Sequence, residues 1–82
     1  DTILTSKDGG PRLAEIQVEE DSPLARSTVK NVATSNGVQV LALSRAGDGL
    51  LVTPDEEATI EPGDAIVVVG PDEKLTAMEG KE

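Results

Sequence analysis

The chain has 82 residues, of which 16 are acidic and 7 basic, and it contains no Cys, His, Phe, Tyr or Trp. The formal charge of −9 argues against binding to nucleic-acid backbones or anionic membranes, and the missing residue types exclude disulfides, His- or Cys-based zinc sites and His-assisted nucleophilic catalysis. A chain of this length is one small domain whose core must be aliphatic, so we expect dimerisation or docking onto a longer protein to add stability.

The N-terminal residues 1–12 are polar, and the segment Lys7-Asp8-Gly9-Gly10-Pro11 is typical of a flexible linker. Because the chain starts without Met, we expect it to be a fragment of a longer polypeptide. Residues 13–18 alternate between apolar and polar side chains, which predicts a half-buried strand.

A helix is predicted to begin at Ser22-Pro23-Leu24, with Ser22 as N-cap and Pro23 at the first helical position. A narrow apolar stripe then continues to Val32. Asn36-Gly37 is expected to end the helix, because Gly readily adopts the left-handed conformation found at helix C-termini.

Three strands and a second helix are expected after residue 37. Residues 38–44 are apolar on nearly both faces, which predicts a central strand, and the glycines within residues 45–49 predict a hairpin to a strand at residues 50–53. The turn Pro62-Gly63-Asp64 leads into an apolar run at residues 65–69, typical of a strand covered on both faces. Asp72 can cap a short helix that buries Leu75 and Met78, and residues 80–82 form a tail.

The functional groups do not indicate an enzyme, and no catalytic or metal-binding residue is expected. The acidic clusters at residues 19–21 and 55–57 lie in predicted loops, lack the spacing of a calcium-binding loop, and are interpreted as solvated surface. Gly47 and Gly49 precede a strand rather than a helix, so they do not form a phosphate-binding loop. Asp64 most simply stabilises its turn. The overall acidity favours solubility, and a host living at high salt is the second interpretation.

In their order and spacing, these segments resemble the TrkA-C domain, also called RCK-C, the C-terminal half of regulators of potassium conductance. The resemblance runs from about residue 13 to residue 78 and rests on Ser22-Pro23-Leu24, residues 37–45, Leu51-Val52-Thr53-Pro54 and residues 61–70. The expected fold is α+β, a small two-layer sandwich in the order β-α-β-β-β-α with a mostly antiparallel sheet, occupying residues 13–79.

The resemblance implies a cytoplasmic regulatory domain that pairs as a homodimer, binds a small effector and biases the gating of a potassium or other cation channel or transporter. Its partners would be the rest of a longer transport protein or a membrane transporter subunit, to which the domain can be tethered, and nucleic acid is not expected. No cofactor is evident in the chain, and NAD would belong to a neighbouring domain. The effector would be cyclic di-AMP or another nucleotide, held across the dimer interface. A purely structural dimerisation or docking module without a ligand is the alternative. A carrier of biotinyl type is not expected, because this chain lacks the exposed hairpin Lys that such carriers modify.

Candidate ligand-binding residues are basic, amide or loop residues within the resemblance: Arg26, Lys30, Asn36, Gln39, Arg45 and Pro54. Structural interpretations compete at Asn36 as a helix-end residue, at Gln39 as a polar group on a strand face, and at Arg45 as a solvated strand end. The chain also departs from the family. Arg26-Ser27 stands where the family commonly has Gly-Lys, and residues 33–39 lack the basic residue that cyclic di-AMP binders tend to carry.

Overall fold

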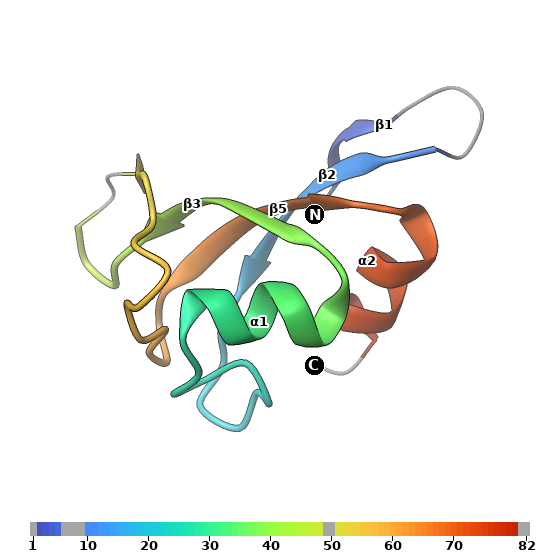
Figure 1. Cartoon of the computed structure of the whole chain (residues 1–82). Coiled ribbons are helices and arrows are strands. Elements are labelled where there is room, and N and C mark those ends of the chain that lie inside the picture. The colour runs from blue at the N-terminus through green and yellow to red at the C-terminus, as the bar shows by residue number, and fades with distance from the viewer. Residues whose placement is uncertain (1, 6–9, 49–50, 81–82) are drawn as a thin grey trace.

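The computed structural model describes residues 2–5, 10–48 and 51–80 of the chain. These residues form, in order, β1 (Thr2–Thr5), β2 (Arg12–Gln17), α1 (Val29–Asn36), β3 (Gln39–Ser44), β4 (Leu51–Val52), β5 (Ala65–Gly70) and α2 (Asp72–Glu79), as Figure 1 shows. The strands make one antiparallel sheet in the order β1-β2-β5-β3-β4. The predicted α+β sandwich is therefore confirmed, with β1 as an additional strand.

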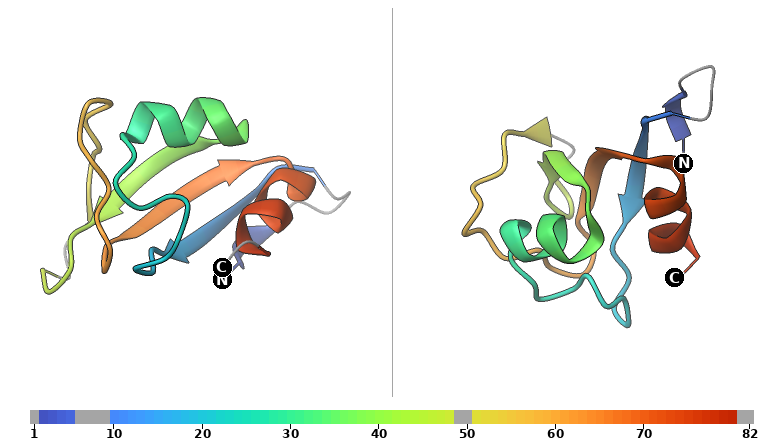
Figure 2. Two further views of the ribbon diagram at one scale, coloured as in Figure 1. Left: turned by 90° about the horizontal axis from the view of Figure 1, so that it is seen from below. Right: turned by 45° about the vertical axis from the view of Figure 1, so that its right-hand side comes forward.

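The core lies between the sheet and both helices, which pack on the same face of the sheet (Figure 2). Ile66 and Val68 of the middle strand β5 are fully buried, and each pairs with core residues on both neighbouring strands. Core residues of the elements around β5 are Ala14, Ile16, Val29, Val32, Val40, Leu43, Leu75 and Met78. Because adjacent side chains of a strand point to opposite faces, burial of all of residues 65–68 confirms the prediction that both faces of β5 are covered.

The expectation of a flexible linker over residues 1–12 is wrong for Thr2–Thr5 and for Arg12. Thr2–Thr5 forms β1, which pairs with β2, and Arg12 is the first residue of β2. The first segment is rich in β-branched residues, which favour extended structure, and the free edge of β2 offers it a partner. Residues 6–9 of the expected linker lie outside the described part of the chain.

Helix α1 begins at Val29, so the predicted start at Pro23 is also wrong. The hydroxyl of Thr28, rather than that of Ser22, caps the helix by accepting a hydrogen bond from the Asn31 N–H at 3.1 Å. Ser22 has the same capping chemistry but uses it in a turn, where its hydroxyl accepts from the Leu24 N–H at 3.0 Å. The N-cap signal in the sequence was therefore real, but the structure it caps is a turn.

The chain between this turn and α1 pairs with residues distant in sequence. The Arg26 N–H donates to the Ile60 carbonyl at 2.6 Å, and the Ile60 N–H donates to the Ser27 carbonyl at 2.8 Å. These bonds use backbone groups that a helix through residues 23–28 would need for itself, so they fix the later helix start.

Arg26 has φ +72°, and no other non-glycine residue in the described ranges has a positive φ. Replacing Arg26 with Gly is expected to raise the free energy of unfolding by about 0.5–1 kcal/mol, because relief of strain exceeds the greater chain entropy of Gly. Urea denaturation measures the difference. Arg26→Ala is the matched control, since it removes the same exposed ion pair with Glu20 but keeps the Cβ. A Gly variant no more stable than the Ala variant would contradict the expectation.

The end of α1 agrees with its prediction, and β3 and β4 pair antiparallel as the predicted hairpin requires. Asn36 is the last helical residue, and Gly37 adopts the left-handed conformation with φ +68°. The Asn36 side chain also donates from Nδ2 to the Val32 carbonyl at 2.8 Å, which supports the last turn. Gly49 and Leu50 of the predicted hairpin lie outside the described residues.

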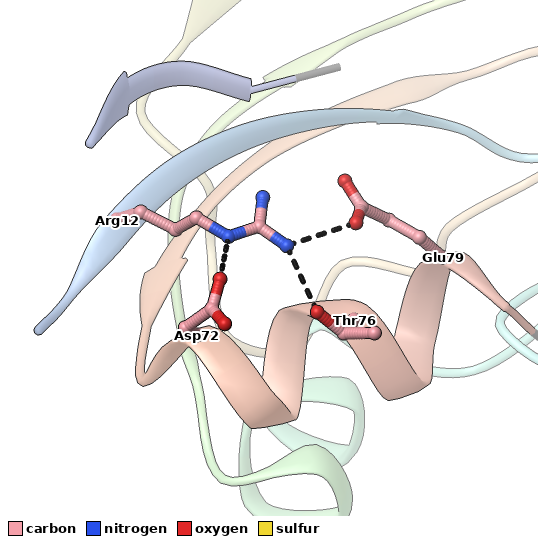
Figure 3. A network of polar contacts seen from close by, with 4 residues as sticks. All are labelled: Arg12, Asp72, Thr76 and Glu79. Atoms are coloured by element: carbon pink, nitrogen blue, oxygen red, sulfur yellow. Dashed lines mark hydrogen bonds and ion pairs between the residues drawn. The ribbon is translucent and has the colours of Figure 1, made fainter. Parts of the chain in front are cut away.

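Helix α2 is attached to the start of β2 by the buried side chain of Arg12 (Figure 3). Its Nε donates to Asp72 Oδ1, and its Nη2 donates to Glu79 Oε1 at 3.0 Å and to Thr76 Oγ1 at 3.3 Å. The hydrogen bonds to Glu79 and Asp72 raise the pKa of Arg12 above its ordinary value. Since a raised pKa in the folded state favours folding while the group is charged, this contribution is lost only in strongly alkaline solution.

No helix in the described ranges has the length and apolar character needed to cross a membrane.

Candidate functional site

A groove of about 450 Å³ lies between α1, β3 and the segment that follows β4. Its lining residues are Val29, Lys30, Ala33, Thr34, Gln39, Val40, Leu41, Thr53, Pro54 and Glu56. The four α1 residues in this set recur with a spacing of four, so they share one face of the helix. The groove is thus built by one helix face, one strand and one loop.

Backbone hydrogen bonds fix the loop wall of the groove against the start of α1. The Lys30 N–H donates to the Glu56 carbonyl at 3.0 Å, and the Val29 N–H donates to the Ala58 carbonyl at 2.9 Å. These are N–H groups of the first helical turn, which have no partner within the helix. The loop therefore supplies hydrogen-bond acceptors to the first turn of α1 and also forms one wall of the groove.

Lys30, Gln39 and Pro54, three of the six candidate residues, meet in this groove. Lys30 and Gln39 are exposed, and Pro54 is half-buried. An ammonium group, an amide with both a donor and an acceptor, and a rigid apolar ring together suit a ligand that has a polar edge and a flat apolar face.

The other three candidates lie outside the groove. Arg26 donates from Nη2 to Glu20 Oε2 at 2.8 Å on an exposed surface. Asn36 faces a different cavity, on the other side of α1. The interpretation of Arg45 as a solvated strand end is incomplete. Its Nη1 donates to Asp64 Oδ2 at 2.7 Å and to the Thr59 carbonyl at 2.9 Å.

Leu41 gives the groove an exposed apolar rim. The pairing of β3 with β5 shifts register between Val40 and Ala42, so Leu41 sits at a β-bulge, a feature that redirects side chains. Leu41 is 43% exposed, and Val52 on the adjacent strand β4 is 49% exposed. They are the two large exposed hydrophobic residues in the described part of the chain. Leu41 lines the groove and Val52 directly precedes its lining residue Thr53, which indicates a contact surface.

The charge around the groove is balanced or negative. Among the described residues, Lys30 is the one cation in its lining, and Glu56 opposes it. Asp55 and Glu57 flank Glu56 and are also exposed. In the described part of the chain, no three His, Cys, Asp or Glu side chains are arranged so that they could hold a metal ion. The groove therefore does not favour a highly anionic ligand unless other charges compensate.

Sequence reasoning missed the remaining lining residues of the groove. Val29, Ala33 and Thr34 follow from helical spacing once the true helix start is known. The exposure of Leu41 has no local signal, because a bulge depends on how β3 pairs with β5.

Comparisons with known proteins agree with this architecture. The model of the TrkA-C domain family matches residues 13–80. Ktr system potassium uptake protein A of Vibrio alginolyticus is 40% identical over 68 residues, which cover 80% of this chain and 30% of that protein. The chain therefore spans less than a third of the length of this relative.

Two solved structures are similar to the chain. The GsuK RCK domain superposes with a TM-score of 0.79 at 25% identity, over 99% of this chain and 17% of that one. The RCK_C domain dimer of S. agalactiae BusR in complex with c-di-AMP has a TM-score of 0.65 at 32% identity, over 85% of this chain and 90% of that one.

Proposed function

Because the chain belongs to the TrkA-C domain family of regulatory domains, we propose that it is the cytoplasmic sensor of a potassium or other cation transport system. In this proposal the domain pairs with a second copy, binds a small effector and biases the gating of a channel or transporter. It acts as part of a longer transport protein or alongside a membrane transporter subunit, consistent with its similarity to a potassium uptake protein. It has no catalytic role.

The groove with its exposed Leu41 rim is the observation that carries this proposal. An exposed apolar rim on a groove of mixed polar and apolar lining suits a seam between two copies, in which a symmetric ligand meets each contact twice. The similar BusR domain is a dimer in complex with c-di-AMP, which supports such a seam. Coupling between effector and gate would amount to about 1–3 kcal/mol, a typical allosteric free energy.

Four of the residues that line the groove have a role in this proposal. The Gln39 amide hydrogen-bonds the edge of a base, Lys30 contacts a phosphate, and Pro54 packs on the flat face of the ligand. The carboxylate of Glu56 disfavours ligands with several negative charges. An effector with few charges, or one accompanied by a bound cation, fits best.

A thermal-shift panel tests effector binding. Its members are cyclic di-AMP, cyclic di-GMP, ATP, ADP, AMP, NAD, K⁺, Mg²⁺ and Ca²⁺. At least one is expected to raise the melting temperature, and at 100 times its Kd an effector adds about 2.7 kcal/mol of stability. Gln39→Ala is expected to weaken the response about tenfold, the value of one good hydrogen bond.

Gln17→Ala is the matched control, because Gln17 is an exposed glutamine on β2, which β5 separates from β3 and its groove. This variant should respond like the parent chain. A response lost equally in both glutamine variants would place binding elsewhere.

The alternative function is a structural dimerisation or docking module without a ligand. The acidic Glu56 in the groove favours this alternative, since it opposes the one lining cation among the described residues. If the chain is a dimer and no member of the panel changes its melting temperature, the structural module replaces the sensor as the proposed function.

A further inference from the structure

A second cavity, of about 260 Å³, lies on the opposite side of α1 from the groove, between this helix, the turn at residues 22–27 and α2. Its floor consists of Leu24, Val32 and Met78, all of them core residues that are at most 7% exposed. Its rim is polar and includes Asn31 and Asn36 of α1. The cavity thus combines an apolar base with hydrogen-bonding groups at its mouth, the usual character of a small-molecule site.

Helix α1 separates the two cavities. Residues 29, 30, 33 and 34 face the groove, whereas residues 31, 32, 35 and 36 face the second cavity. Each set repeats with a spacing of four residues, as two opposite faces of one helix must. The helix is therefore a wall shared by both cavities, so a molecule in one contacts the element that shapes the other.

None of the residues lining the second cavity is charged, although 28% of the chain is. A phosphate group in the cavity would find no lining cation and would sit in a chain of charge −9. The lining therefore selects a neutral ligand.

The two asparagines leave a complementary donor and acceptor at the rim. Asn36 uses Nδ2 to donate to the Val32 carbonyl at 2.8 Å, and no hydrogen bond between described residues occupies its Oδ1. Asn31 uses Oδ1 to accept from the Ser35 hydroxyl at 3.4 Å, and its Nδ2 is likewise unused within the described ranges. The two unused groups lie five residues apart on α1, so they can pair with an acceptor and a donor at different positions of one ligand.

We propose that the cavity between α1, the turn at residues 22–27 and α2 binds a neutral purine base or nucleoside, at a site separate from the groove. The amino group of adenine can donate to Asn36 Oδ1, and a ring nitrogen at another edge or a ribose hydroxyl can accept from Asn31 Nδ2. The flat ring packs on the aliphatic floor and contacts the thioether of Met78, a favourable partner for aromatic rings.

Titration of the 82-residue chain with adenosine, followed by methyl and amide NMR, tests the proposal. We expect saturable shifts at the Leu24, Val32 and Met78 methyl groups, with AMP binding at least about tenfold more weakly because of its phosphate. Absence of saturable shifts up to the solubility of adenosine, or equal binding of AMP, would overturn it. Shifts confined to groove residues would overturn it as well.

Asn31→Ala and Gln39→Ala are reciprocal variants that separate this site from the groove. Asn31 is exposed and its backbone N–H still reaches the Thr28 cap, so the variant keeps the fold. Asn31→Ala should weaken adenosine binding about tenfold and leave direct contacts in the groove intact, whereas Gln39→Ala should leave adenosine binding unchanged. Loss of adenosine binding in the Gln39 variant would contradict a separate site, and the groove can fail its own effector panel without affecting this result.

Discussion

Replacing Asp64 with Ala is expected to lower the free energy of unfolding by about 3 kcal/mol, a large share of the stability of a domain this small. The carboxylate is 3% exposed and accepts hydrogen bonds from the Arg45 side chain, the Ala46 N–H and the Glu61 N–H. Its removal leaves two backbone N–H groups and a guanidinium without this partner. The penalty for such unsatisfied groups exceeds the net value of the bonds that are lost.

Asp64 joins two turns that the sequence separates. Its Oδ2 accepts from the Glu61 N–H within the turn that precedes β5, and its Oδ1 accepts from the Ala46 N–H at the end of β3. Asn at this position keeps one carbonyl oxygen but places an NH₂ group against an existing donor. Asp64→Asn is therefore also expected to destabilise the chain, by less than Ala does.

Urea denaturation followed by circular dichroism measures both Asp64 variants. Asp48→Ala is the control, because Asp48 is an exposed acid in the turn after β3 and its removal changes the net charge equally. The control should remain within about 0.5 kcal/mol of the parent chain. An Asp64→Ala variant as stable as the control would show that the buried carboxylate does not hold the turns together.

Replacing Leu41 with Glu is expected to convert the proposed dimer into a monomer that remains folded. Leu41 is 43% exposed in the single chain, so its replacement leaves no cavity in the core. At a two-fold seam the change buries an unpaired carboxylate in each copy. Two such charges should weaken association at least about 100-fold.

Sedimentation velocity measures the mass of this variant against the 8.5 kDa expected for one chain. Ala77→Glu is the matched control, since it adds the same charge to an exposed position of α2 outside the groove. The control should remain dimeric, and both variants should keep the circular dichroism spectrum of the parent. A Leu41→Glu variant that remains dimeric would place the interface on another surface.

The elements that were predicted correctly are those whose structure depends on residues close to them in the sequence. The turn at residues 62–64 and the apolar run of β5 form as expected, and Gly37 takes the left-handed conformation that ends α1. The interpretation of Asp64 as a turn residue agrees with its bond to Glu61 but left out the larger part of its role, the contacts with Arg45 and Ala46.

Long-range pairing explains what the sequence did not predict. Ser22-Pro23 can begin either a turn or a helix. The backbone hydrogen bonds of Arg26 and Ser27 with Ile60 decide in favour of the turn. Arg12 reads as a polar residue of a linker, yet it is buried because α2 brings two carboxylates to it. The bulge at Leu41 likewise depends on the partner strand.

For the same reason, three of the six candidate residues meet in the groove, and their role in binding stays a prediction. Lys30, Gln39 and Pro54 come from three segments that the fold brings together, and the family resemblance named all three. Asn36 is close to Gln39 in the chain but lines the cavity on the other side of α1, so its proximity in sequence does not bring it into the groove.

The stoichiometry of effector binding tests the central claim most directly. Isothermal titration calorimetry of the chain with the nucleotide that stabilises it most in the thermal-shift panel should give one bound molecule per two chains. This ratio follows because the groove lies at a seam and both copies contact the same ligand. Binding of one molecule per chain with full affinity in the monomeric Leu41→Glu variant would contradict the account.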